Sequence, residues 1–203
     1  MPTQLSRRRF LQITALSSAV KAAMGGELST DLSATGPAGV LPETYGPQAV
    51  PLAITVNERP VVVQAEPRMT LAELLRGPLQ LTGTKIACNR GACSACTVLL
   101  DGAPVCSCMT LAIDVGTRSV TTIEGLADGN MLNAIQEAFI EHDAVQCGFC
   151  TPGLVLSCTA LLRKHSHPSA DEVKAAICGH YCRCGTYPHV VSATLAAADG
   201  RKP

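Results

Sequence analysis

Apolar and polar residues alternate over several short stretches in the first half of the chain, which is the pattern of β-strands. Residues 52–56 alternate up to a turn at residues 57–58, and a β-branched run follows from Val61. Residues 97–100 and 104–108 form a second pair of runs around an Asp-Gly turn. We therefore expect two antiparallel hairpins.

Helical patterns interrupt the strands once and then take over the second half. Thr70 and Glu73 have the spacing of a capping box, which predicts a short helix that Gly77 ends. From Asn130 to His142 the apolar residues recur at helical spacing. Further helices are predicted over residues 151–164, 169–178 and 188–198. Four short helices in a row imply a small bundle.

The composition excludes one class of function and points to another. Sixteen basic and sixteen acidic residues balance to zero net charge and form no basic stripe, so nucleic acid is excluded as a partner. The chain has eleven cysteines, none of them in the first 87 residues. They fall into two groups, within residues 88–108 and 147–184. Such clustering indicates metal ligation.

The first group has a recognisable spacing. Cys88, Cys93 and Cys96 follow the C-x4-C-x2-C pattern of a plant-type [2Fe–2S] cluster, which needs a fourth cysteine further on. Iron in such a cluster is bound by soft thiolate sulfur. The fourth ligand is Cys106 or Cys108, and periodicity cannot separate them, because residues two apart on a strand face the same way. A zinc site, which usually pairs C-x2-C units, and a redox dithiol, which needs only two cysteines, are the alternatives.

The second group precedes two of the predicted helices. Cys147 and Cys150 stand directly before the helix that Thr151 is expected to cap, and Cys182 and Cys184 stand before the final helix. Helix N-termini present free N–H groups and partial positive charge, which suit an anionic, thiolate-ligated cluster. Four thiolates supplied from two helix starts form a specific arrangement.

The sequences from Val145 to Gly153 and from Tyr181 to Pro188, together with the first cysteine loop, carry a family resemblance. They resemble the iron–sulfur subunit of xanthine dehydrogenase-type molybdenum hydroxylases, most of all the small subunits of periplasmic aldehyde oxidoreductases. The resemblance implies an α+β fold, with an N-terminal β-grasp, ferredoxin-like [2Fe–2S] domain followed by a small four-helix-bundle [2Fe–2S] domain. It assigns the clusters to Cys88, Cys93, Cys96 and Cys108, and to Cys147, Cys150, Cys182 and Cys184.

The same resemblance implies a role in electron transfer. Electrons would pass from a molybdopterin cofactor on a large partner subunit through the two clusters to FAD or a cytochrome on another subunit, and Gln146 would contact the pterin. No residue of this chain is expected to be catalytic. Ala87 and Ser94 stand where glycine is common, and Cys178 where serine is usual. A free ferredoxin and a disulfide-stapled exported binding module are the rival functions.

The N-terminus carries a predicted export signal. Residues 6–12 resemble a twin-arginine signal with Arg7 and Arg8 as the pair, and the apolar run over residues 10–20 is shorter than the roughly 20 residues that span a bilayer. We therefore expect the twin-arginine machinery to export the protein to the periplasm. The predicted organisation is a signal over residues 1–24, a flexible linker over 25–50, a ferredoxin-like domain over 51–126 and a helical domain over 127–203.

Three cysteines and all five histidines have no part in either predicted cluster. Cys106, Cys158 and Cys178 are expected to be small apolar fillers. The histidines expected at the surface or at a domain boundary are His142, His165, His167 and His189.

Overall fold

A computed structural model of the chain describes residues 46–129 and 131–200. The predicted twin-arginine signal lies outside the described residues, as does most of the predicted linker over residues 25–50. Of the helices that are described, none has both the length and the apolar character of a membrane span.

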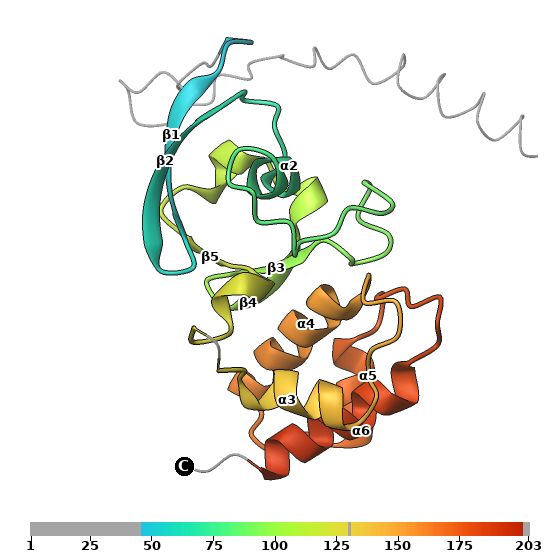
Figure 1. Cartoon of the computed structure of the whole chain (residues 1–203). Helices are drawn as coiled ribbons and strands as arrows, with labels where there is room; N and C mark the ends of the chain where they lie inside the picture. The colour runs from blue at the N-terminus through green and yellow to red at the C-terminus, as the bar shows by residue number, and fades with distance from the viewer. Residues whose placement is uncertain (1–45, 130, 201–203) are drawn as a thin grey trace, which may run out of the picture. The chain divides into compact units, whose positions relative to one another are not determined.

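The first half of the described chain forms a mixed five-stranded sheet (Figure 1). Its strands are β1 (Val50–Val56), β2 (Arg59–Ala65), β3 (Thr97–Leu100), β4 (Ala103–Cys106) and β5 (Ser119–Thr121). The strand order is β2-β1-β5-β3-β4, so both predicted hairpins are confirmed. The sequence patterns did not predict β5, which joins the hairpins by pairing parallel to β1 and antiparallel to β3.

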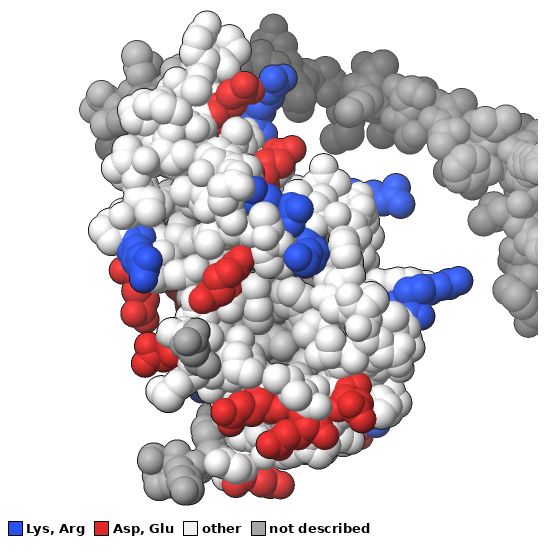
Figure 2. All heavy atoms as spheres, in the orientation of Figure 1, with Lys and Arg blue, Asp and Glu red and all other residues white. Residues whose placement is uncertain are grey.

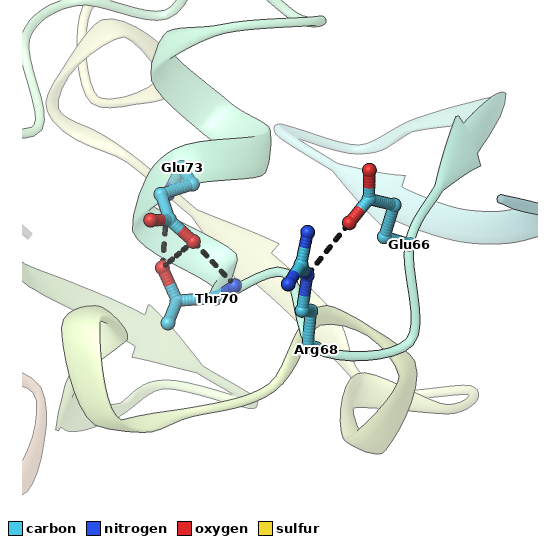
Figure 3. Close-up of polar contacts among 4 residues, drawn as sticks. All are labelled: Glu66, Arg68, Thr70 and Glu73. Carbon is cyan, nitrogen blue, oxygen red and sulfur yellow. Dashed lines mark hydrogen bonds and ion pairs between the residues drawn. The ribbon is translucent and has the colours of Figure 1, made fainter. Parts of the chain in front are cut away.

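Helix α2 (Leu71–Arg76) packs on one face of this sheet and begins with the predicted capping box. The Thr70 hydroxyl accepts from the Glu73 backbone N–H, and the Glu73 carboxylate accepts from the Thr70 N–H at 2.9 Å (Figure 3). Leu71, Leu74 and Leu75 are fully buried against the sheet. Burying each leucine contributes about 1.5–3 kcal/mol. The helix thus depends on its apolar face more than on the cap.

Strand β3 has both faces buried, which explains its unbroken apolar run. Val98 and Leu100 point into the core that contains α2. Leu99, on the opposite face, packs against Leu156 and Ala160 of helix α4 (Thr151–Lys164). Strand β3 therefore packs against α2 on one face and against α4 of the helical half on the other (Figure 1).

Four α-helices form the second half, as predicted (Figure 1). They are α3 (Ala134–Glu141), α4, α5 (Ala170–Ala176) and α6 (Tyr187–Asp199). Their common core contains Phe139, Leu154, Cys158 and Val190. The short 3-10 helices of the described chain are η1 (Ser107–Met109), η2 (Ala112–Val115) and η3 (Ile123–Gly125).

Three predicted boundaries were wrong. The helix predicted from Asn130 begins at Ala134, because Asn133 forms an unforeseen capping box with Gln136. Thr151 is the first residue of α4 rather than its cap, and Cys150 occupies the cap position. The return strand predicted to reach Cys108 ends two residues earlier, where the chain turns into η1.

Candidate metal centres

The first cysteine set lies in the loop between α2 and β3 and in η1. Its thiols contact each other in two pairs, Cys88 with Cys93 and Cys96 with Cys108. The Ala92 N–H donates to Cys88 Sγ at 3.3 Å. These contacts place all four predicted ligands of the first cluster together.

The structure separates Cys106 from Cys108, which the sequence pattern could not. Because β4 ends at Cys106 and η1 follows, the two residues do not share one face of a strand. Cys108 is buried and its sulfur accepts from the Gly91 N–H at 3.3 Å. Cys106 is half-buried and its thiol lies 4.0 Å from the Gly91 carbonyl oxygen. The contact between Cys96 and Cys108 favours Cys108 as the fourth ligand, although the assignment stays a prediction.

The loop owes its curl to three residues in the left-handed region of backbone space. Asn89, Gly91 and Ser94 have φ angles of 49°, 72° and 54°. Glycine adopts this conformation without strain, whereas a β-carbon makes it costly. The backbone at Ser94 would therefore suit glycine better than serine.

The second cysteine set comes from two loops of the helical half. Cys147 and Cys150 follow α3, and Cys182 and Cys184 lie between α5 and α6. The thiols again contact in pairs across the loops, Cys150 with Cys182 and Cys147 with Cys184. The Cys182 sulfur also lies 3.3 Å from the Thr186 hydroxyl, at the start of α6.

The thiols of each set differ in acidity. Hydrogen bonds, first from the Arg90 N–H and then from Cys93 and Ala92, lower the pKa of Cys88 to about 7. Burial raises the pKa of Cys108 to about 11, with the Cys96 thiol adding to the effect. Each set therefore offers thiolate at neutral pH from which metal binding can begin.

The same contrast holds in the second set. Burial raises the pKa of Cys150 to about 12, and its contact with Cys182 acts in the same direction. Burial also opposes ionisation of Cys182, but hydrogen bonds from Thr186, Cys150 and Cys184 outweigh it and lower that pKa to about 7. A metal ion replaces the proton that such a thiol pair shares.

This two-by-two pairing fits a [2Fe–2S] cluster in each set. Such a cluster takes four cysteines, two on each iron. A structural zinc ion instead needs its four ligands to converge on one point. The arrangement favours clusters over the zinc alternative.

The two sets meet at a close contact between the domains. The Tyr181 N–H, adjacent to Cys182, donates to the Cys93 carbonyl oxygen at 3.1 Å. Beside it, Gly153 of α4 faces Ser94 so closely that a β-carbon would lie 2.5 Å from the Ser94 carbonyl oxygen. Only glycine permits this approach.

The surface beside the second set is open and partly apolar. Gln146 and Cys147 are exposed, and Phe149 is 45% exposed. Arg90 and Arg183 are exposed within the two cysteine loops. Cationic side chains mark the side where Figure 1 shows these loops, whereas carboxylates gather over α3 (Figure 2). The arginines offset the negative charge of thiolates.

The cysteines and histidines outside the two sets differ in how well their predicted burial agrees with the structure. Cys158 is fully buried among the helices, which confirms it as a filler. Cys178 is exposed, so that prediction was wrong: α5 ends at Ala176 and leaves Cys178 in the following loop. Of the four histidines expected at the surface or boundary, His142 is half-buried and the others are exposed.

No pattern in the sequence assigns a role to His180, which is 8% exposed and lies between the domains. Burial lowers its pKa, and the Ile177 and Gly153 carbonyls partly oppose that effect. No local pattern marks such a residue, because its neighbours come from distant parts of the chain.

Two family models match the chain. A 2Fe–2S iron–sulfur cluster binding domain matches residues 54–119, and a [2Fe–2S] binding domain matches residues 122–195. The nicotine 6-hydroxylase small subunit of Paenarthrobacter nicotinovorans is 47% identical over 148 residues, which are 73% of this chain and 89% of that protein. The aldehyde oxidoreductase iron–sulfur-binding subunit PaoA of Escherichia coli O157:H7 is 37% identical over 209 residues, which cover 96% of this chain and 88% of PaoA.

The solved structures that superpose on this chain belong to the same kind of oxidoreductase as these relatives. Quinoline 2-oxidoreductase from Pseudomonas putida 86 superposes with a TM-score of 0.73 and 44% identity, over 75% of this chain and 95% of that one. The aldehyde oxidoreductase of Desulfovibrio desulfuricans ATCC 27774 superposes with a TM-score of 0.70 and 40% identity, over 73% of this chain but 17% of that longer one. These relatives exclude a disulfide-stapled binding module. The chain belongs to the family of two-domain iron–sulfur subunits that transfer electrons in molybdenum hydroxylases.

Proposed function

We propose that this chain is the periplasmic iron–sulfur subunit of an aldehyde oxidoreductase. It would receive electrons from molybdopterin on a large subunit and pass them to FAD or a cytochrome on another. A [2Fe–2S] cluster, when bound, takes up and gives back one electron at a time. The observation that carries the proposal is the hydrogen bond from Tyr181 to Cys93, which joins the two cysteine sets by a short covalent and hydrogen-bonded route.

The second set is proposed to lie at the molybdopterin side. Gln146 directly precedes Cys147, and both are exposed beside the half-exposed Phe149. A partner can therefore reach these residues without opening the fold. The Desulfovibrio desulfuricans aldehyde oxidoreductase supports a large partner, since the matching part is 17% of one longer chain.

The first set is proposed to lie at the exit. Asn89, Arg90, Gly91 and Ala92 are exposed in its loop, and Met109 beside them is 64% exposed. The backbone around Cys88 thus reaches the surface, where an acceptor on another subunit can approach. The exposed apolar Met109 suits such a contact.

Interrupting one set at a time tests this order. In the purified complex, Cys150→Ser should let the molybdenum centre accept electrons from substrate but leave the Cys88–Cys108 cluster oxidised during turnover. Cys93→Ser should let the second set accept electrons and block delivery to the external acceptor. Cys178→Ser is the matched control, since this exposed thiol lies outside both sets. Fast reduction at the first set in a Cys150→Ser complex that lacks the second cluster would refute the order.

The substrate class rests on a smaller observation. The match to the PaoA subunit extends over 96% of this chain, whereas the match to the nicotine 6-hydroxylase subunit covers 73%. We therefore expect aldehydes, rather than N-heterocycles, to reduce the purified complex. Reduction by quinoline or nicotine but not by an aldehyde would contradict this choice.

Export is proposed from Arg7 and Arg8, which precede Phe10 and Leu11. The long PaoA match includes most of the N-terminal region and supports this reading. Because thiols must stay reduced until clusters are inserted, folding in the cytoplasm before export suits this protein. Replacing both arginines by lysine should leave loaded protein in the cytoplasm. Loaded double mutant found in the periplasm would overturn the export proposal alone.

A further inference from the structure

The contact between the domains is centred on the His180 imidazole. Its Nε2 lies 3.1 Å from the Ser157 hydroxyl on α4 and 3.4 Å from the Thr97 hydroxyl on β3. Thr97 already donates its hydrogen to the Ser94 carbonyl oxygen at 2.7 Å, so toward His180 it only accepts. The Ser157 hydroxyl can donate or accept, so it can bond Nε2 in either tautomer of the ring. One ring nitrogen joins a strand of the first domain to a helix of the second.

The backbone that follows this imidazole is fixed as well. The Tyr181 N–H bonds to Cys93 across the domain boundary. The Tyr187 hydroxyl accepts from the Cys182 N–H at 2.8 Å and donates to the His180 carbonyl oxygen at 3.0 Å. Hydrogen bonds thus fix the segment of residues 180–182. It ends at Cys182, a predicted ligand of the second set, and bonds to Cys93, a predicted ligand of the first.

The contacts of His180, the Tyr181 N–H and the Tyr187 hydroxyl differ in which domains they connect. Tyr187 belongs to α6, so its hydroxyl orders the segment within the helical domain only. The Tyr181 N–H bonds to the other domain, but Tyr181 itself is 68% exposed, so its side chain does not fix the loop. His180 is the buried side chain that holds this loop against both domains, since Thr97 and Ser157 are each 3% exposed.

We propose that His180 is a positioning residue that holds the 180–182 segment against β3 and so fixes the separation of the two cysteine sets. The inference rests on the proposed electron-transfer role of these sets. Removing the imidazole should leave each set of four thiols complete, because His180 contacts none of them through its side chain. What should change is the contact across which electrons pass.

Three variants of the full chain, in complex with its partner subunits, test this role. His180→Leu removes the hydrogen bonds, His180→Asn keeps a side-chain N–H, and His189→Ala is the control at an exposed histidine of the same domain. In His180→Leu the Tyr181 amide hydrogen should exchange with solvent about tenfold faster, as loss of one hydrogen bond allows. Freeze-quench EPR after substrate addition should show a longer lag between reduction of the second and of the first cluster signal than in the unmodified complex.

His180→Asn should recover most of both effects, and His189→Ala should show neither. Unchanged Tyr181 exchange and an unchanged lag in His180→Leu with full iron content would overturn the proposal. If His180→Leu loses iron, Ser157→Ala decides, since it removes one anchor and keeps the ring: faster Tyr181 exchange supports the proposal, and unchanged exchange overturns it. Absence of two cluster signals in the unmodified chain would overturn the proposed function instead.

Discussion

Replacing Gly153 by alanine would place a methyl group where the two domains touch. The new β-carbon would lie 2.5 Å from the Ser94 carbonyl oxygen, so one of them must move by about 0.9 Å to reach ordinary contact at 3.4 Å. Ser94 has little freedom to move, because its carbonyl oxygen accepts hydrogen bonds from the Thr97 hydroxyl at 2.7 Å and the Thr97 N–H at 3.2 Å.

Two opposing effects set the magnitude. Alanine favours a helix interior by about 1 kcal/mol relative to glycine, and that value is an upper bound for Gly153, which lies in the first turn of α4. Overpacking costs about 1–3 kcal/mol, and the upper part of that range applies because the obstacle is backbone. We expect Gly153→Ala to lower the free energy of unfolding by about 1–2 kcal/mol, which corresponds to a fall in Tm of about 2–8 °C.

Thermal unfolding of the iron-loaded chain, followed by far-UV circular dichroism, measures this effect. Ser192→Ala is the matched control, since Ser192 lies on the exposed side of α6 and its replacement should change stability by less than about 0.5 kcal/mol. A rise in Tm for Gly153→Ala, of the size that helix propensity alone predicts, would show that the domains are not in tight contact here.

Three further predictions concern the cysteines and one helix start. Cys108→Ser should lower iron from about four to about two per chain while Cys106→Ser keeps it, and equal loss in both would contradict the ligand choice. In the apoprotein, peptide mapping should show alkylation of Cys88 levelling off about one pH unit above its pKa of about 7, whereas alkylation of Cys108 should rise toward pH 11; matching profiles would refute the pKa difference. Ser169→Ala removes the α5 capping box and should destabilise the chain by about 1 kcal/mol at unchanged iron content, and an unchanged Tm would speak against it.

Features of this fold that depend on neighbouring residues could be predicted from the sequence. The turn at Asn57 and Glu58, both with positive φ, and the Thr70 and Ser169 caps are examples, because each is decided within four residues. The cysteine spacing likewise indicated both sets. Strand β5 was missed since its three residues become a strand only by pairing with β1 and β3.

The choice between Cys106 and Cys108 as fourth ligand likewise could not be made from local sequence. Strand periodicity made them equivalent, and η1 separates them only because the chain turns after β4. The role of His180 depends on Thr97, which is 83 residues away, and on Ser157, which is 23 residues away. Such contacts follow from packing between domains, which no local pattern records.

The helices of this protein differ in whether a side chain caps their N-terminus, and this difference bears on the fate of copies that lack clusters. Helices α2, α3 and α5 carry reciprocal side-chain caps, whereas within the described chain no side chain caps α4 or α6, the two helices that follow cysteines. The capped helices can form when the chain first collapses, but the N–H groups that open α4 and α6 suit an anionic cofactor. A copy that never received its clusters would fray at those two places. Housekeeping proteases that cut frayed chain would then remove empty copies and leave loaded ones to assemble.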